Sequence, residues 1–330
     1  MTGKRWLAIL LAIALLFISI GFRFATSVAS EKFENVFVID DSPFKENVLV
    51  EGFGDKIVVL TVNGIIQDLG QTPFMSSLTY NHALFLQMIE EAAKDQTVDG
   101  IILHINSPGG GVVESAEIHE KIVEVQEEYN KPVYVSMGNT AASGGYYIAA
   151  SADKIVAHPA TITGSIGVIM ESINVSELAE NYGIDFNTIK SGKYKDILSS
   201  TREMTNEEEA LLQTIIDEMY MDFVQVIVDG RGMTEENVLE LADGRIYTGK
   251  QAHENGLIDA LGTLDDTIDL MIDEQDLVNA QVVEYEYSFN WFDMLSVSLR
   301  NVLKSDSEIL DLLTVLRESD SPRAMYLYQR

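Results

Sequence analysis

The sequence predicts an α/β fold in which strands and helices alternate as stacked ββα units. Short apolar runs of strand length alternate with longer segments in which apolar residues recur every three or four positions. Two of the strand–helix junctions are rich in glycine, at residues 109–111 and 144–145. With 330 residues, the chain is long enough to bury a sizeable core in one or two domains.

Seven segments have the length and composition of strands. The segment 98–105 is rich in apolar residues, as in a strand buried on both faces, whereas 281–287 alternates apolar and polar residues. The predicted strands are residues 56–62, 98–105, 133–137, 154–157, 162–168, 186–189 and 281–287.

Seven further segments have helical spacing. In the segment 113–129, Ile118, Ile122 and Val125 recur on one face, and glutamates occupy the opposite face. The segment 206–228 begins with several glutamates, which the positive end of the helix dipole stabilises. The predicted helices are residues 81–94, 113–129, 175–181, 206–228, 237–241, 250–255 and 264–272.

The two ends of the chain differ from this central region. Lys4 and Arg5 precede 17 residues without a charge, residues 6–22, which is the short limit for a membrane-spanning helix. The basic residues place the N-terminal end in the cytoplasm. The small residues 27–29 resemble a cleavage site, so a removed signal peptide is the alternative to a retained anchor.

Composition excludes several classes of function. The formal net charge of −30 argues against a nucleic-acid partner, because binding phosphates requires a basic surface. The absence of cysteine excludes disulfides and a thiolate nucleophile. The sequence contains no H-E-x-x-H or C-x-x-C pattern, so we expect neither a metal nor another cofactor.

Ser143 lies at one of the two glycine-rich junctions. It follows the strand 133–137 and precedes a short helix-compatible stretch, and its neighbours are too small to cover it. A serine at such a turn projects its hydroxyl beside outward-pointing backbone N–H groups, which can bind an anion. The alternative is a helix N-cap serine beside glycines that pack closely.

The second glycine-rich junction is residues 109–111, after the strand 98–105. Bare backbone N–H groups at a strand end suit an oxyanion hole or a phosphate cradle, and a plain tight turn is the alternative. The phosphate interpretation is weak, because no G-x-x-x-x-G-K-[ST] pattern is present.

Four motifs occur in a characteristic order: NSPGG at residues 106–110, AASGGYYIA at 141–149, TGSIGV at 163–168 and SGKYKDI at 191–197. Together they resemble the signal peptide peptidase A family, serine–lysine peptidases on the fold of crotonases and caseinolytic proteases. The resemblance extends from about residue 56 to about residue 262. It implies a peptidase domain at 56–287.

A serine hydroxyl needs a base to become a nucleophile. Caseinolytic proteases carry their catalytic histidine in the region that here contains no histidine, residues 164–166. His158 and His104 are the remaining histidine candidates. We expect His158 to cap a strand and His104 to pack in the interior. A histidine-based triad is therefore disfavoured.

A lysine base fits better, provided that burial lowers its pKa from the reference value of about 10.4. Lys190, Lys193 and Lys195 lie close together, and their spacing does not distinguish them. The resemblance selects Lys195 as general base and assigns Ser165 to orient it. We expect Asp196 to point away from Lys195, as neighbouring side chains do in an extended segment.

The oxyanion hole would consist of the N–H of Gly144 and one from Gly109 or Gly110. Ser143 would attack a peptide carbonyl, the base would pass its proton to the leaving amine, and water would deacylate the enzyme.

The remaining segments are a cytoplasmic stub and anchor at 1–30, a linker at 31–55 with room for one strand, and a helical tail at 288–330. Helices are predicted at 291–303 and 307–316. The apolar residues 324–328 should dock on the body of the protein, with a neighbouring subunit or a peptide groove as alternatives.

The resemblance implies a serine endopeptidase that degrades cleaved signal peptides and other extended apolar peptides. It also favours a retained single-pass anchor in the cell membrane with the catalytic domain outside the cytoplasm. A further implication is a ring-like homo-oligomer in which neighbouring subunits share each site. The alternatives are a related membrane protease that cleaves a stomatin-like partner, an acyl-coenzyme A enzyme on the same fold, and a binding scaffold with an inert site.

Overall fold

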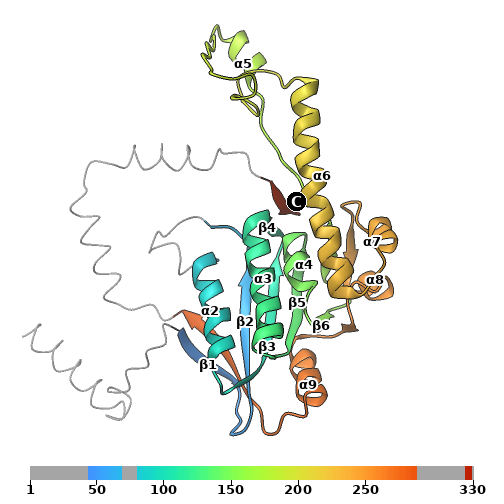
Figure 1. Ribbon diagram of the computed structural model, residues 1–330. Helices are drawn as coiled ribbons and strands as arrows, with labels where there is room; N and C mark the ends of the chain where they lie inside the picture. Colours follow the sequence, from blue (N-terminus) through green and yellow to red (C-terminus); the bar gives the residue numbers. More distant parts are fainter. Residues whose placement is uncertain (1–43, 69–79, 288–323, 329–330) are drawn as a thin grey trace, which may run out of the picture. The chain divides into compact units, whose positions relative to one another are not determined.

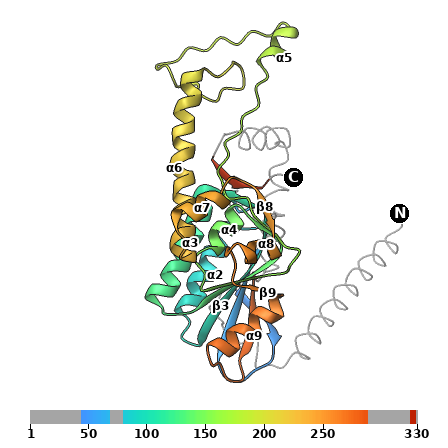
Figure 2. The ribbon, with the colours of Figure 1, turned by 90° about the vertical axis from the view of Figure 1, so that its right-hand side faces the viewer.

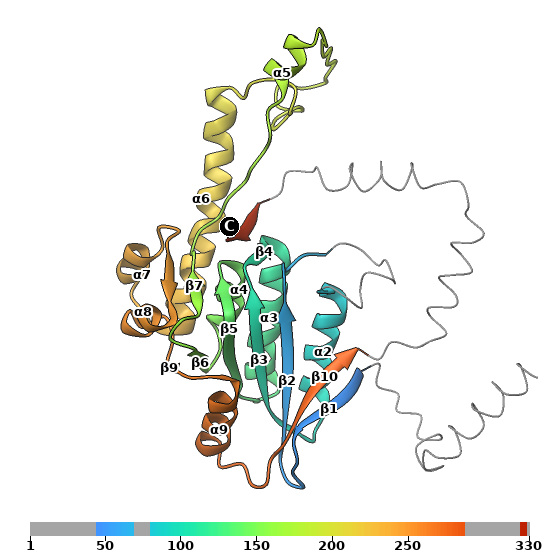
Figure 3. The same ribbon diagram turned by 180° about the vertical axis from the view of Figure 1, so that it is seen from behind.

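The computed structural model describes residues 44–68, 80–287 and 324–328. A mixed sheet forms its centre, with the strand order β1-β10-β2-β3-β5-β6-β9, and β7 and β8 extend from β5 (Figures 1, 2 and 3). The pairings from β10 through β9 are parallel, whereas β1 pairs antiparallel with β10 and β8 antiparallel with β7. The strands are β1 Phe44–Val50, β2 Lys56–Asn63, β3 Val98–Ser107, β5 Val133–Ala142, β6 Lys154–Ala157, β7 Ile162–Gly164, β8 Ile246–Thr248, β9 Ala260–Leu261 and β10 Gln281–Tyr287. The predicted α/β class is confirmed.

Helices cover both faces of this sheet, as parallel strands require. Leu60, Leu103 and Val135 point into the larger core beneath α2, α3 and α4, whereas Ile102 and Tyr134 point into a smaller core with α9 on the opposite face (Figures 1 and 3). The helices are α2 His82–Lys94, α3 Val112–Glu128, α4 Gly144–Ala149, α5 Ser176–Asn181, α6 Asn206–Arg231, α7 Glu235–Leu241, α8 Gly249–Glu254 and α9 Leu264–Glu274.

The segment 31–55 contains the one strand for which the prediction left room: β1 begins at Phe44 and pairs with β10. Other sequence predictions need correction. Residues 186–189 form no strand, since they are exposed and have no partner strand to satisfy their backbone groups. Residues 324–328 contain a strand, β11 (Met325–Leu327). The predicted helices at 291–303 and 307–316 lie outside the described residues.

The predicted membrane anchor at 1–30 also lies outside the described residues. Within the parts of the chain that the structure describes, no helix is both long and apolar enough to cross a membrane.

A long arm projects from the end of the sheet. It consists of residues 170–205, which include α5, and the N-terminal half of α6 (Figures 1 and 2). A capping box between Thr205 and Glu208 starts α6, and Gly232 in the left-handed conformation ends it. Phe223, Val224 and Ile227 are its buried apolar residues, so the C-terminal half anchors the arm to the body.

Replacing Ile227 by alanine should lower the free energy of unfolding by about 2–5 kcal/mol, because the change leaves a cavity in the larger core. Urea denaturation followed by circular dichroism would measure the change. Leu239→Ala on α7 is the control, since its side chain is 40% exposed and its loss should cost far less. Equal effects of the two substitutions would contradict the anchoring role of α6.

Candidate active site

Ser143 occupies a strained turn between β5 and α4. Its backbone has φ 53° and ψ −117°, a conformation that non-glycine residues rarely adopt. The Ser143 N–H donates to the carbonyl of Gly164 at 2.7 Å, and the Ser143 carbonyl accepts from Tyr146 and Tyr147. Ser143 occupies the N-cap position of α4, but its hydroxyl makes no capping hydrogen bond to the helix. The turn instead resembles the strand–turn–helix elbow that presents a nucleophilic serine.

The two glycine-rich junctions lie against each other. A Cβ on Gly109 would stand 2.6 Å from the amide nitrogen of Gly144, and a Cβ on Gly144 would stand 3.0 Å from the amide nitrogen of Gly110. Only glycine fits at this contact, and Gly109 also has φ 99°. The N–H of Gly109 already donates to the Ser107 hydroxyl at 3.0 Å. Gly110 in turn pairs with Tyr326 of β11, so both glycines remain candidate oxyanion donors.

Ser165 lies beside the Ser143 turn. Strands β5 and β7 pair Ala142 with Gly164, so the residue after each of these is a serine. Ser165 also has a positive φ, 52°, and its N–H donates to the Arg245 carbonyl at 2.8 Å. The structure therefore brings Ser143, Ser165 and the glycine backbones into one neighbourhood.

Lys195 lies elsewhere, in the arm. It belongs to a series of turns at residues 193–198 that contacts the first turn of α6. In the body, Phe223 of α6 packs on Tyr147 with 5.0 Å between ring centroids. Glu207 precedes Phe223 by 16 residues, which is about 24 Å along a helix. Within one chain, the lysine segment is thus remote from the Ser143 turn.

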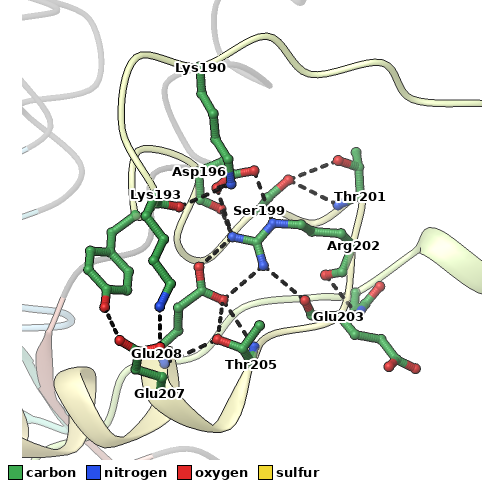
Figure 4. Close-up of polar contacts among 12 residues, drawn as sticks. Lys190, Lys193, Asp196, Ser199, Thr201, Arg202, Glu203, Thr205, Glu207 and Glu208 are labelled. Carbon is green, nitrogen blue, oxygen red and sulfur yellow. Dashed lines mark hydrogen bonds and ion pairs between the residues drawn. The ribbon is translucent and has the colours of Figure 1, made fainter.

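The structure distinguishes the three lysines that spacing left equivalent (Figure 4). Lys190 pairs with Asp196 at 2.5 Å, and Lys193 pairs with Glu207. Lys195 is exposed and forms no ion pair with any described residue. The segment is also turned rather than extended, with Ile197 N–H donating to the Tyr194 carbonyl, so the expected separation of Lys195 and Asp196 by strand geometry does not apply.

The histidines have other roles. The Nδ1 of His158 accepts from the N–H of Ala160 at 3.1 Å, which confirms a local cap. His104 lies in β3, and burial lowers its pKa. None of the five histidines, all of which are described, hydrogen-bonds Ser143.

Sequence reasoning missed how the C-terminal residues dock. β11 pairs antiparallel with β4 (Gly109–Gly111), which places Tyr326 opposite Gly110. Tyr326 is 1% exposed and stacks on Tyr147 with centroids 4.9 Å apart. Its hydroxyl donates to the Met219 carbonyl at 3.0 Å. The apolar character of 324–328 was the available signal, and the predicted docking is confirmed in the form of a strand.

The turn that carries Lys195 is held by carboxylates whose charge persists in acid. Hydrogen bonds from Arg202 lower the pKa of Glu208 to about 2 and hold the pKa of Asp196 well below its usual range. A lowered carboxyl pKa stabilises the folded turn above the unfolded pKa of about 4 and loses that effect as the pH falls through the folded value.

Hydrogen exchange of residues 194–208 at matched intrinsic rates should therefore show constant protection from pH 7.5 to 5. Protection should fall only as the pH decreases from about 4 toward 2. Loss of protection near pH 6 would contradict the role of these carboxylates.

Comparison with known proteins extends over the whole chain. The sequence model of peptidase family S49 matches residues 126–278, and that of Clp protease matches residues 75–164. The "Putative signal peptide peptidase SppA" of Enterococcus faecium is 37% identical over 342 residues, covering 99% of each chain. This chain belongs to peptidase family S49. It is therefore a serine peptidase, and the resemblance drawn from the four motifs is confirmed.

Other S49 relatives match parts of the chain. Protease 4 of Salmonella typhi is 35% identical over 215 residues, which cover 65% of this chain and 34% of that protein. The chloroplastic serine protease SPPA of Arabidopsis thaliana is 37% identical over 180 residues, which cover 54% of this chain and 26% of that protein. Among the described residues of this S49 peptidase, no group of acidic or histidine side chains could hold a metal ion.

Proposed function

We propose that this S49 peptidase is a membrane-anchored serine endopeptidase with a Ser143–Lys195 dyad, which degrades cleaved signal peptides and other extended apolar peptides. The strained Ser143 turn beside the Gly109–Gly111 backbone is the observation that carries the proposal. The name of the Enterococcus relative supports the substrate class. The uncharged segment 6–22 with its basic flank supports a retained single-pass anchor, with the catalytic domain outside the cytoplasm.

In the proposed reaction, the Ser143 Oγ attacks the scissile carbonyl carbon, and its proton passes to the neutral amine of Lys195. The N–H group of Gly144 and one from Gly109 or Gly110 stabilise the oxyanion, and the Ser165 hydroxyl orients the lysine. The C–N bond then breaks as Lys195 protonates the leaving amine. Water attacks the acyl-enzyme with the same lysine as base and frees Ser143.

The active site is shared between subunits in this proposal. Ser143 lies at the body and the lysine turn lies on the arm, so one folded chain does not bring them together. The arm also exposes large apolar side chains, including Ile173, Tyr182 and Ile189. Such side chains are typical of a protein interface. A neighbouring copy that buries them in a ring would supply Lys195 to Ser143.

Substrates should bind by strand addition along β4. β11 already uses this edge, and its Tyr326 ring packs on Tyr147 and Phe223. An extended apolar peptide can make the same backbone bonds and place an apolar side chain against the same two rings.

Removal of residues 322–330 should raise the activity on apolar peptides, because β11 competes with substrate for β4. We expect KM to fall severalfold in a fluorogenic peptide assay, with kcat largely retained. Tyr326→Ala should have a smaller effect in the same direction, since the strand remains but its buried ring is lost. An unchanged or higher KM after truncation would exclude β11 as a competitor.

The test of this function uses the full chain in detergent micelles, a synthetic signal peptide and a fluorogenic apolar peptide. Cleavage of both, together with labelling of Ser143 by a fluorophosphonate, is the expected result. A protein that is labelled at Ser143 but cleaves neither peptide would favour the alternative, a membrane protease dedicated to a stomatin-like partner.

A further inference from the structure

Arg202 joins the lysine turn, residues 193–198, to the start of α6 (Figure 4). Its Nε and Nη2 donate to the two carboxylate oxygens of Asp196 at 3.0 and 2.8 Å, in a bidentate pair. Its Nη1 and Nη2 also donate to Glu208 at 2.8 and 2.6 Å. A further bond reaches the main-chain carbonyl of Asp196 at 3.0 Å. The guanidinium thus ties the turn to the first turn of α6.

Glu208, the partner of Arg202 on α6, is itself held in place. The Glu208 side chain is only 3% exposed and accepts from the N–H of Thr205 at 3.0 Å in the capping box. The carboxylate of the adjacent Glu207 accepts hydrogen bonds from the side chains of Lys193 and Tyr194. Residues on both sides of Lys195 are therefore held to α6 by polar contacts.

Little else holds this turn within the chain. Its residues are exposed or half-exposed, and Leu198 has a φ of 64°, which costs energy in a non-glycine residue. A strained conformation persists only where its surroundings enforce it. The bidentate pair between Asp196 and Arg202 spans Leu198 and supplies that constraint.

Arg202 also matters for charge. Asp196 follows Lys195 directly, and a free carboxylate near an ammonium group favours the protonated amine. A general base must be neutral, so a free Asp196 would oppose the reaction. In the structure, Arg202 and Lys190 occupy both oxygens of Asp196.

We propose that Arg202 is a positioning residue for the general base: it holds the turn that presents Lys195 and keeps the Asp196 carboxylate engaged. The inference rests on the proposed function, because it takes Lys195 as the base.

The experiment measures kcat, KM and the pH dependence of kcat for the full-length assembled protein in detergent micelles with the fluorogenic apolar peptide. Arg202→Gln should lower kcat about tenfold to a hundredfold, because a catalytic group displaced by 1 Å can lose that much. KM should change less than about twofold. The acid-side midpoint of the pH profile should rise by about one unit or more, since Asp196 loses its bidentate partner and keeps only Lys190.

A second substitution separates the two effects. In Arg202→Gln/Asp196→Asn the released carboxylate is absent, so the midpoint should return to the wild-type pH while kcat stays low. Lys94→Gln on α2 removes an exposed ion pair with Glu90 and is the matched control, with unchanged kinetics. If Arg202→Gln fails to assemble, Asp196→Asn is the deciding variant. A low kcat with no rise in the acid-side midpoint of the pH profile supports the proposal. A wild-type kcat overturns it.

Other outcomes are equally distinct. A wild-type kcat and midpoint in Arg202→Gln would overturn the inference alone, provided that Ser143→Ala and Lys195→Ala are inactive. A lower kcat with no shift of the midpoint would reduce Arg202 to structural support and also overturn it. Activity in Lys195→Ala would instead refute the proposed function, and this inference with it.

Discussion

Ser143→Ala is expected to abolish peptide hydrolysis, with kcat at least about 10⁴-fold below the wild-type value, as for other peptidases that lose their nucleophile. The strained φ of 53° and the absence of a capping bond indicate that this serine is not held for its structural role. Alanine removes only the hydroxyl, so the fold and the glycine contact should persist.

The measurement compares purified wild-type and Ser143→Ala protein in the fluorogenic assay, with oligomeric state checked by light scattering. Ser151→Ala is the control, because its hydroxyl contacts His119 just beyond the C-terminal end of α4, and its loss should leave kcat within about twofold. Residual hydrolysis above one per cent in Ser143→Ala, with a normal assembly, would assign the nucleophile to another residue.

Lys195→Ala should cause a loss of similar size, because Ser143 then has no base. Lys195→Arg should be equally inactive, since a guanidinium keeps its proton and cannot act as a base. Lys250→Ala removes an exposed pair with Glu254 on α8 and should retain activity. An active Lys195→Arg variant would show that the site requires a positive charge rather than a base.

Mixing the two inactive variants tests whether the site is shared. If each site combines Ser143 of one subunit with Lys195 of its neighbour, mixed rings should recover about a quarter of wild-type activity after random assembly. Subunits must be dissociated and reassembled together, and each variant treated alone serves as the control. No recovery in verified mixed assemblies would place both residues in one subunit.

The elements with a clear local signal could be predicted from the sequence. The apolar runs of β2 and β3 and the helical spacing of α3 and α6 appear in the structure at nearly the predicted residues, whereas β5 extends beyond its predicted end at 137 to Ala142. The glycine-rich motifs marked the Ser143 turn and its partner backbone, because close approach and positive φ exclude other residues. The family followed from the same motifs, and the full-length relative confirmed it.

The features that the sequence left open or mispredicted depend on contacts across the chain. Residues 186–189 have the composition of a strand but no neighbouring strand to pair with. Residues 44–50 lie in a segment of mixed composition, yet they form β1 because β10 offers an open edge. The pairing of β11 with β4 joins residues more than 200 positions apart, which no local pattern can encode.

The sequence by itself determined the α/β class, the catalytic serine candidate and three equivalent lysine candidates, because turn chemistry and periodicity act over a few residues. Only the tertiary structure separated Lys190 and Lys193, which are engaged in ion pairs, from Lys195, which forms no ion pair with any described residue. It also placed the lysine turn on an arm remote from Ser143 and set Arg202 between Asp196 and Glu208. These features depend on which charges meet in space, and that is decided by how α6 packs on the body.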